Sequence, residues 1–357
     1  MKVTRIGLDL AKNVFQVHGV DRPEQVVVRR QLSRGQMKAF FEKLPPCLIG
    51  MEACASAHYW GRLFQQMGHT VRLIAPQFVK PYVKSQKNDA NDAEGICEAV
   101  SRPSMRFVAV KTVEQQDMQA LHRIRSELVR QRTAKANQIR GLLGEYGLVV
   151  AQRIDQLRRV LPQLCEDIES GLSADFRGLL EGLRQDLVYL DERIHALDEK
   201  LIQAARTNEA ARRLQSIPGI GPITSTALVA SLGDARTFKK GRDVSAWIGL
   251  TPRQHSSGGK DRLAGISKRG DTYLRTLLIH GARAVLKTVK NKTDPRSRWI
   301  TGVSERRHQN IAAVALANKN ARIVWALLSR GGQYASEYGM CIGNEQNSYF
   351  TEECLAA

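Results

Sequence analysis

Four acidic residues have the types and spacing for divalent-metal chemistry. Asp9 and Glu52 each lie at the end of an apolar, strand-like segment, where an isolated carboxylate is costly to desolvate and a metal ion is a common partner. Asp89 and Asp92 are three residues apart at the start of an expected helix, which places them on one face. The four acids therefore predict a site for Mg²⁺, with Mn²⁺ as the alternative ion. Such sites perform phosphodiester chemistry by clamping the attacking and leaving oxygens.

A second candidate site is a glycine-rich loop that contains Ser256 and Ser257 beside Gly258 and Gly259. Basic side chains crowd this loop and the start of the next helix, and we expect them to bind nucleic-acid phosphates: Arg253, Lys260, Arg262, Lys268, Arg269 and Arg275. A serine hydroxyl held against a phosphate could attack it and form a covalent intermediate. The residues alone favour the simpler interpretation, a loop that only grips phosphate, because no base stands beside either serine except His255.

The elements that must position the acids follow the order of an RNase H-like (RuvC-like) fold. Three β-rich segments with tight connections predict an antiparallel meander, and helix, strand, helix and strand signals follow. The expected strands are 3–11, 14–20, 25–32, 47–52 and 70–75, and the expected helices are 36–43, 58–67 and 90–100. In this fold the first and fourth strands are neighbours at the centre of the sheet, so Asp9 and Glu52 would face each other.

The middle of the chain predicts a coiled-coil arm made of two long helices. Apolar residues recur at alternating spacings of four and three: Phe176, Leu180, Leu183, Leu187, Leu190, Ile194, Leu197 and Leu201. An upstream helix begins at Met118, but its seam is weaker because Arg125 occupies a position that a strict heptad would make apolar. Residues 144–147 and Pro162 are expected to interrupt the helices. The arm could dimerise two chains, which is the reading we favour, or form a helical hairpin within one chain.

The last region is expected to be mainly α-helical. The segment from Ile217 to Thr224, followed by an apolar helix, is typical of a helix-hairpin-helix. Its glycines, Gly219 and Gly221, would let backbone N–H groups approach a phosphate. The alternative is a simple glycine-rich turn between helices. Further helices are expected at 272–286 and 310–328, and the tail after Gly331 is expected to be loosely ordered.

Composition points to a polyanionic partner. The 357 residues carry a formal net charge of +19, and residues 236–298 alone contain sixteen Lys or Arg and four Asp. Six scattered cysteines form no CxxC or zinc-finger spacing and are expected to be reduced thiols. No apolar signal region and no apolar run near the ~18 residues of a membrane span are present. We therefore expect a cytoplasmic, bacterial protein, associated with the nucleoid when bound to DNA, and no membrane partner.

Taken together, the motifs resemble the IS110 family of insertion-sequence transposases, particularly its IS1111 branch, which is related to the Piv DNA invertase. The matching segments extend over about three quarters of the chain: residues 6–12, 51–52, 87–93, 217–222, 249–253, 256–260 and 266–270. The resemblance implies a RuvC-like domain with a DEDD metal site formed by Asp9, Glu52, Asp89 and Asp92. It also implies a serine nucleophile, which falls on Ser257, with Ser256 as the less favoured neighbour.

The resemblance further implies what the protein does and binds. Members excise and insert DNA through a circular intermediate, as dimers or tetramers, guided by a structured noncoding bridge RNA that pairs with target and element-end DNA. The implied domains are a RuvC-like domain at 1–110, a coiled-coil arm at 111–208, a C-terminal transposase domain at 209–332 and a tail at 333–357. Through the arm, the acids of one subunit and the serine of another would form one composite site.

Two other functions compete with this expectation. A Holliday-junction endonuclease of the RuvC type would use the acids alone, with metal-activated water as the nucleophile. A basic architectural protein with a decayed site would bind DNA without cutting it, although the complete set of four acids argues against decay. A Ser257→Ala variant separates the first rival, and an Asp9→Asn variant separates the second.

Overall fold

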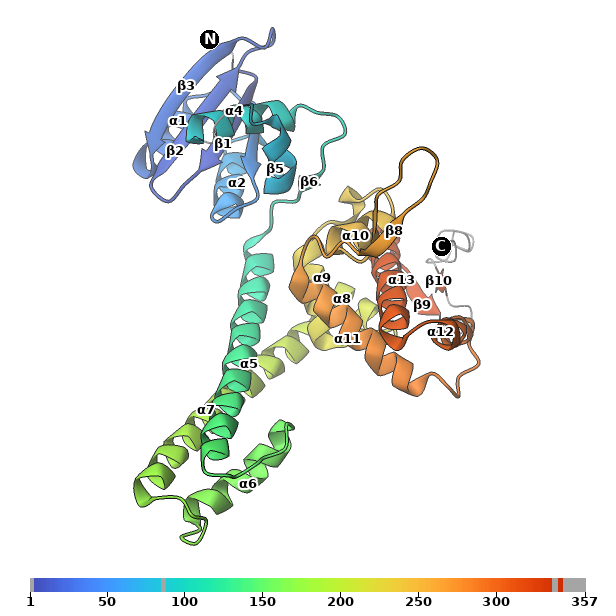
Figure 1. Cartoon of the computed structure of the whole chain (residues 1–357). Helices are drawn as coiled ribbons and strands as arrows, with labels where there is room; N and C mark the ends of the chain where they lie inside the picture. The colour runs from blue at the N-terminus through green and yellow to red at the C-terminus, as the bar shows by residue number, and fades with distance from the viewer. Residues whose placement is uncertain (1–2, 85–87, 336–339, 343–357) are drawn as a thin grey trace. The chain divides into compact units, whose positions relative to one another are not determined.

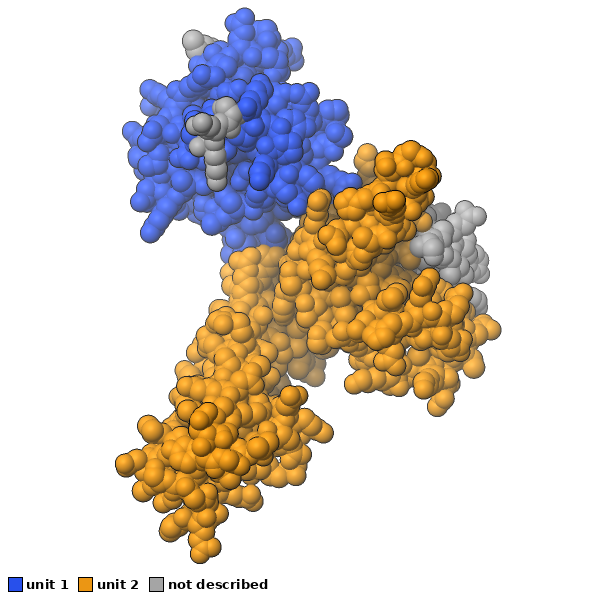
Figure 2. All heavy atoms as spheres, in the orientation of Figure 1, with its two compact units in different colours: residues 1–116, 232–237 blue, residues 117–231, 238–357 orange. Residues whose placement is uncertain are grey.

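The computed structural model describes residues 3–84, 88–335 and 340–342. The chain divides into two compact units, residues 1–116 with 232–237 and residues 117–231 with 238–357 (Figure 2). The first unit contains the acidic residues, and the second contains the arm and the serine loop.

A six-stranded mixed sheet forms the centre of the first unit, in the order β3-β2-β1-β4-β5-β6 (Figure 1). Its strands are β1 (Arg5–Leu10), β2 (Val14–Val20), β3 (Val26–Ser33), β4 (Leu48–Glu52), β5 (Thr70–Ile74) and β6 (Phe107–Val108). The first three strands form the expected antiparallel meander, and β1 pairs in parallel with β4. The expected neighbourhood of the first and fourth strands is therefore confirmed.

Side chains of the central strands alternate between the two faces of the sheet, and helices cover each face. Ile6 and Leu8 of β1, like Ile49 and Met51 of β4, are fully buried against the core that contains Phe41 and Phe64. That core belongs to α1 (Arg34–Glu42) and α2 (Ala57–Gln66). The opposite face is covered by α4 (Asp89–Val100), with α3 (Pro76–Val79) and the short 3₁₀ turn η1 (Lys80–Tyr82) beside it. Because side chains alternate between the faces, Gly7, Asp9, Gly50 and Glu52 lie on the α4 side.

The arm of the second unit is built from α5 (Val113–Glu145) and α7 (Ala174–Thr207), with α6 (Ile154–Glu166) against them (Figure 1). The two long helices were expected, whereas α6 was not. Pro162 lies inside α6, so the expected interruption at this residue is wrong. The helix tolerates it because Leu157 and Leu161 are fully buried and anchor the helix around the missing hydrogen bond.

The apolar seam of α7 packs within the chain. Phe176, Leu180 and Leu187 join Ile139 and Leu143 of α5 and Leu157 of α6 in one core, and Leu190 and Ile194 join Leu128 of α5. Arg125, which breaks the upstream heptad, forms an ion pair with Asp198 of α7. The intramolecular hairpin, the less favoured interpretation of the sequence, thus occupies this seam.

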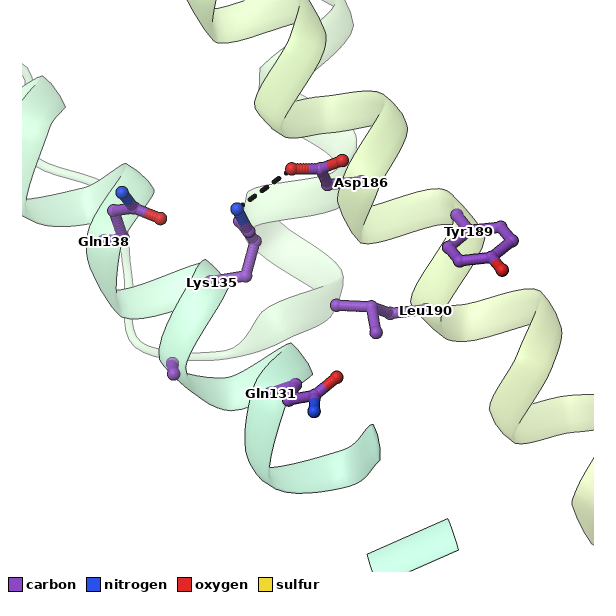
Figure 3. A pocket seen from close by; sticks show the side chains of 7 residues that line it. Gln131, Lys135, Gln138, Asp186, Tyr189 and Leu190 are labelled. Carbon is purple, nitrogen blue, oxygen red and sulfur yellow. Dashed lines mark hydrogen bonds and ion pairs between the residues drawn. The ribbon is translucent and has the colours of Figure 1, made fainter. Parts of the chain in front are cut away.

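A shallow groove between α5 and α7 runs along the outside of the arm. Figure 3 shows Lys135 and Asp186 joined across it at 2.9 Å, with Gln131, Gln138 and Tyr189 on its walls. Tyr189 in this part of the groove is 57% exposed, and apolar side chains continue the groove along the arm to Leu179, which is 67% exposed. Within the described part of the arm, this groove therefore leaves apolar side chains uncovered.

Helices make up most of the remaining part of the second unit. They are α8 (Glu209–Leu214), α9 (Pro222–Leu232), α10 (Gly241–Ile248), α11 (Thr272–Thr288), α12 (Pro295–Arg306) and α13 (Gln309–Arg330), with the 3₁₀ turn η2 (Ala235–Thr237) in the segment assigned to the first unit. A hairpin, β7 (Pro252–Gln254) and β8 (Leu263–Ile266), precedes α11. The expected helices at 272–286 and 310–328 are confirmed.

Helix α13 forms the centre of these helices. It packs against α10, α11 and α12, and it is long and apolar enough to cross a membrane by length and composition alone. Most of it is buried inside the unit, including the side chains of Lys319 and Asn320. A buried core helix passes the same test, and the packing supports that interpretation.

The tail expected after Gly331 lies largely outside the described residues. Within the described part, β9 (Gln333–Ala335) and β10 (Met340–Ile342) pair as a short antiparallel hairpin. The expectation of loose order is not met by these two strands.

Candidate metal site and serine hairpin

Two glycines bring α4 against the centre of the sheet. A Cβ on Gly7 would lie 2.1 Å from the carbonyl oxygen of Ala93, and a Cβ on Gly50 would lie 2.8 Å from the Cβ of Val100. Each glycine stands two residues before an acid, on the same face of its strand. The close approach of α4 is therefore built into the same short segments that carry Asp9 and Glu52.

The other two acids lie in the first turn of α4. Asn88 caps this helix, because its side-chain oxygen accepts a hydrogen bond of 2.8 Å from the backbone N–H of Asn91. Carboxylates are favourable at this end of a helix, where the backbone N–H groups and the helix dipole attract negative charge. Asp89 and Asp92 therefore suit their positions even before any ion is considered.

The structure brings three of the four predicted acids together. One carboxylate oxygen each of Asp9, Asp89 and Asp92 lies within 4.8 Å of the other two. Asp9 and Asp92 are half-buried, and Asp89 is exposed. Since three like charges at this separation repel one another, a cation is the natural partner of the cluster.

Glu52 is not a member of this three-acid cluster, although it lies on the same side of the sheet. The parallel register pairs Leu8 with Met51, so Asp9 and Glu52 each follow one residue later on neighbouring strands. Burial raises the pKa of the Cys54 thiol, and the carboxylates of Glu52 and Asp9 raise it further. Both acids thus act on the same thiol, which places Glu52 at the border of the cluster.

The donor set fits a hard divalent cation. Mg²⁺ prefers carboxylate oxygens and retains several waters. The three acids, one on β1 and two on α4, therefore supply enough ligands, and the exposed side at Asp89 leaves room for the waters. No histidine or cysteine ligand belongs to the cluster, which makes a site of the zinc type a poorer match. The residues present therefore fit Mg²⁺ or Mn²⁺.

The serine loop of the second unit is an ordered β-hairpin. Ser257 and Lys260 pair across its tip, where Gly258 and Gly259 have φ values of 57° and 73°. Two consecutive positive φ angles are typical of a two-residue hairpin turn that matches the twist of its strands, and glycine adopts them without strain. The pair of glycines thus has a structural role in presenting the serines.

The two serines differ in what holds their hydroxyl groups. Ser256 Oγ accepts hydrogen bonds from Gln254 Nε2 at 2.8 Å and from the backbone N–H of Arg262 at 3.3 Å. No side-chain hydrogen bond joins Ser257 to another of the described residues, and it is exposed at the tip of the hairpin. Ser256 therefore helps to hold the hairpin together, whereas the Ser257 hydroxyl makes no such hydrogen bond within the described part of the chain.

Most of the basic residues predicted for this loop point to solvent, but Arg275 does not. Arg253, Lys260, Arg262, Lys268 and Arg269 are exposed on or beside the hairpin. Arg275 is 8% exposed, and its guanidinium donates to the carbonyl oxygens of Ile248 at 2.9 Å and Arg269 at 3.2 Å. The expectation that Arg275 contacts phosphate is wrong for this structure, because its donors hold the base of the hairpin.

The two glycines of the turn between α8 and α9 have different surroundings. Gly219 has a φ of 91° and packs against α11, where an added Cβ would lie 2.8 Å from the carbonyl oxygen of Gly281. Close helix packing therefore accounts for this glycine without a phosphate. Around Gly221 an added Cβ would meet nothing within 4 Å, so this position is open.

A buried hydrogen-bond network that the sequence reading did not find connects the arm with α9 and α11. His122 of α5 contacts Tyr273 Oη through Nδ1 and Thr226 Oγ1 through Nε2, both at 3.0 Å. Thr226 Oγ1 donates to the carbonyl oxygen of Pro222 at 2.8 Å, so it accepts from Nε2–H and leaves Nδ1 to accept from Tyr273. Burial lowers the pKa of His122 to about 4, which keeps the ring neutral in this network.

Known proteins match the chain over nearly all of its length. A family model described as "Transposase IS116/IS110/IS902 family" matches residues 211–297, and an IS110 transposase model of the DEDD type matches residues 6–147. The chain is 59% identical to the "Probable family 20 transposase" of Pseudomonas aeruginosa, over 92% of this chain and 98% of that protein.

Two other relatives carry the names of insertion sequences. Identity is 51% to the transposase for insertion sequence element IS1111A of Coxiella burnetii, over 92% of this chain and 90% of the relative. The chain is 44% identical to the transposase for insertion sequence element IS1328 of Yersinia enterocolitica, over 92% of this chain and 98% of that relative. The acidic cluster lies in the part of the chain that the DEDD model matches. The chain belongs to the IS110/IS116/IS902 family of transposases.

Proposed function

We propose that this transposase cuts and rejoins DNA at a composite site made of the acidic cluster of one subunit and the serine hairpin of another. The observation that carries the proposal is the meeting of Asp9 with Asp89 and Asp92 at the start of α4. The sheet order and the placement of α4 support an RNase H-like assignment of residues 1–110. In this assignment Glu52 completes the acidic set from the border of the cluster.

The acids would hold Mg²⁺, or Mn²⁺, and the ion when bound would neutralise charge on the scissile phosphate. Asp9 and Asp92 are half-buried, so they would grip the ion more firmly than the exposed Asp89. The chain's own contribution is to fix these oxygens on two rigid elements, a central strand and a capped helix. Rigid placement of charge is the main source of catalysis in phosphoryl transfer.

The serine hairpin would supply the nucleophile. Ser257 Oγ would bond to phosphorus and give up its proton while one P–O bond of the DNA backbone breaks, and the departing oxygen would take a proton. Attack by another strand's hydroxyl would reverse these events and release the serine. Arg253, Lys260 and Arg262, exposed around the tip, would hold the phosphate oxygens during both steps.

The domains and partners complete the proposal. Residues 111–208 would serve as the arm, residues 209–332 as the C-terminal transposase domain and residues 333–357 as the tail. Because the seam of α7 is filled within the chain, a dimer or tetramer would form through the outer groove that exposes Leu179 and Tyr189. A structured bridge RNA would select element-end and target DNA by base pairing, and the reaction would take place at the bacterial nucleoid in the cytoplasm.

The decisive experiment compares Ser257→Ala, Ser256→Ala and Asp9→Asn on element-end DNA with Mg²⁺. We expect wild-type protein and Ser256→Ala to form a covalent protein–DNA adduct on a denaturing gel, and the other two variants to form none. Unchanged cleavage by Ser257→Ala would instead support the Holliday-junction type of endonuclease with a water nucleophile. Sequencing of RNA that co-purifies with the full chain tests the guide, and its absence would contradict that part of the proposal.

A further inference from the structure

A small cavity opens next to Asp9 on the α4 side of the sheet. Its volume is about 210 Å³, and it is lined by β2, β3 and the first turns of α4. The antiparallel register pairs Asp9 with Gln16 and Gln16 with Gln31, so these three residues form one row across the sheet. Since directly paired residues lie on the same face, the cavity begins where the metal cluster ends.

The second row of the cavity contains a buried histidine. His18, paired with Gly7 and Arg29 in the register, is 6% exposed and lines the cavity. No hydrogen bond joins its ring to another residue in the described part of the chain. Burial lowers the pKa of His18, so the ring is neutral and offers one donor and one acceptor.

The charged side chains at the cavity are Arg29, Arg30 and Glu94, with Lys84 beside Glu94. Arg29 Nη2 lies 3.4 Å from Glu94 Oε2, and Lys84 Nζ lies 3.9 Å from Glu94 Oε1. The carboxamides of Gln16 and Gln31 are neutral, and each carries donors and an acceptor. These amides and the neutral imidazole offer the donors and acceptors that the edge of a nucleobase requires.

The size of the cavity agrees with one base. It is smaller than the roughly 300–1,000 Å³ of pockets for drug-sized ligands, and it accommodates a single planar group. Single strands are commonly recognised by bases turned out of the stack and bound at their hydrogen-bonding edges. A strand whose phosphate lies at Asp9 would bring its neighbouring base to this place.

We propose that the cavity between β2, β3 and α4 receives one nucleobase of the strand held at the acidic cluster, read by Gln16, Gln31 and His18. The inference rests on the proposed function, because it takes the acidic cluster as the place where the strand is held. It adds a base-reading subsite to a domain that otherwise holds only ion and backbone. The base could belong to DNA or to RNA, since both present the same hydrogen-bonding edges.

The test uses the full chain and mixed-sequence single strands of roughly 20 nucleotides, a length that spans such a site. One set is DNA containing 4-thiothymidine and the other is RNA containing 4-thiouridine, so that light crosslinks a bound base to the protein. Crosslinked peptides are identified by mass spectrometry in wild type, Gln31→Leu and Gln16→Leu/Gln31→Leu. The control is Gln66→Leu, an exposed glutamine on α2 at the opposite face of the sheet.

We expect crosslinks on β2 and β3 that fall about tenfold in the Gln variants, the effect of losing one good amide–base contact, and that persist in Gln66→Leu. The strand that crosslinks assigns the base to DNA or to RNA. Absence of crosslinks on β2 and β3 with both strands, or equal yields in all variants, would overturn the inference. Mn²⁺ binding by wild type and by Asp9→Asn separates the two proposals. Mn²⁺ binding that requires Asp9, without crosslinks on β2 and β3, rejects the cavity alone. Mn²⁺ binding that does not require Asp9 rejects the metal site.

Discussion

Gly7 of β1 and Ala93 of α4 lie so close that a Cβ on Gly7 would be 2.1 Å from the Ala93 carbonyl oxygen. The obstacle is backbone, which cannot rotate away as a long side chain can. This single contact sets the distance between Asp9, two residues after Gly7, and Asp92, one residue before Ala93. The metal site therefore depends on glycine at position 7 as much as on the carboxylates.

A Gly7→Ala substitution should displace α4 and weaken both the fold and the site. We expect a loss of about 3 kcal/mol or more in unfolding free energy, at the upper end of overpacking effects, together with a lower affinity for Mn²⁺. Urea unfolding and calorimetric titration measure the two effects. Gly35→Ala is the matched control, because an added Cβ there meets nothing within 4 Å; equal behaviour of the two variants would contradict the argument.

The acids should differ in their contribution to metal affinity. Asp9 lies half-buried at the sheet centre within the cluster, and Glu52 lies outside it. We expect Asp9→Asn to lower Mn²⁺ affinity more than Asp92→Asn, and Glu52→Gln to have the smallest effect. Titration calorimetry with the full chain gives the order, and a largest loss from Glu52→Gln would place the ion elsewhere.

Strands and helices of the first unit could be predicted from sequence because their signals are local. Apolar alternation and turn residues depend on neighbours within a few positions, and each expected element there is observed. The encounter of Asp9 with Asp89 and Asp92 followed from fold analogy. A direct signal was present as well, since Gly7 and Gly50 each stand two residues before an acid, which marks a helix approaching at that face.

The predictions that failed concern contacts between residues that are distant in sequence. The heptads of α7 predict an apolar seam but not whether α5 and α6 of the same chain or another chain will cover it. Arg275 was taken as a phosphate ligand because a buried arginine that donates to carbonyl oxygens has the same local sequence as an exposed one. The packing of Gly219 could not be predicted either, since its partner Gly281 lies on another helix.

His122 should make the stability of the second unit depend on pH. Its pKa is lowered from 6.5 to about 4 by burial, so the neutral ring contributes stability that is present above pH 6.5 and lost as the pH falls toward 4. The shift corresponds to roughly 3 kcal/mol. A His122→Gln variant should be less stable at pH 7.5 but should lose less stability down to pH 4.5 than wild type. His280 is exposed, so His280→Gln should change neither the stability at pH 7.5 nor its loss down to pH 4.5. Parallel curves of stability against pH for wild type and His122→Gln would refute the role of the ring.

The outer groove of the arm should control oligomeric state. Leu179 and Tyr189 are exposed there, and the seam beneath is already filled, so Leu179→Glu/Tyr189→Glu should reduce the mass of the particle without lowering stability. Light scattering after size-exclusion chromatography measures the mass. Val149→Glu is the control, at an apolar residue that is 94% exposed and lies in the loop after α5. An unchanged mass in the double variant would exclude the groove as the interface.

Arg275 and the exposed basic residues of the hairpin should respond differently to substitution. Arg275 donates to the carbonyl oxygens of Ile248 and Arg269 and to Thr272 Oγ1 at 3.0 Å, so Arg275→Lys should lower stability by on the order of 2 kcal/mol through lost hydrogen bonds. It should leave the slope of log affinity against log salt unchanged. Lys260→Ala should keep the stability and lower that slope by about 0.9, the value for one phosphate contact in duplex DNA. Fluorescence anisotropy at several salt concentrations measures the slopes, and a smaller slope in Arg275→Lys would return this residue to the nucleic-acid interface.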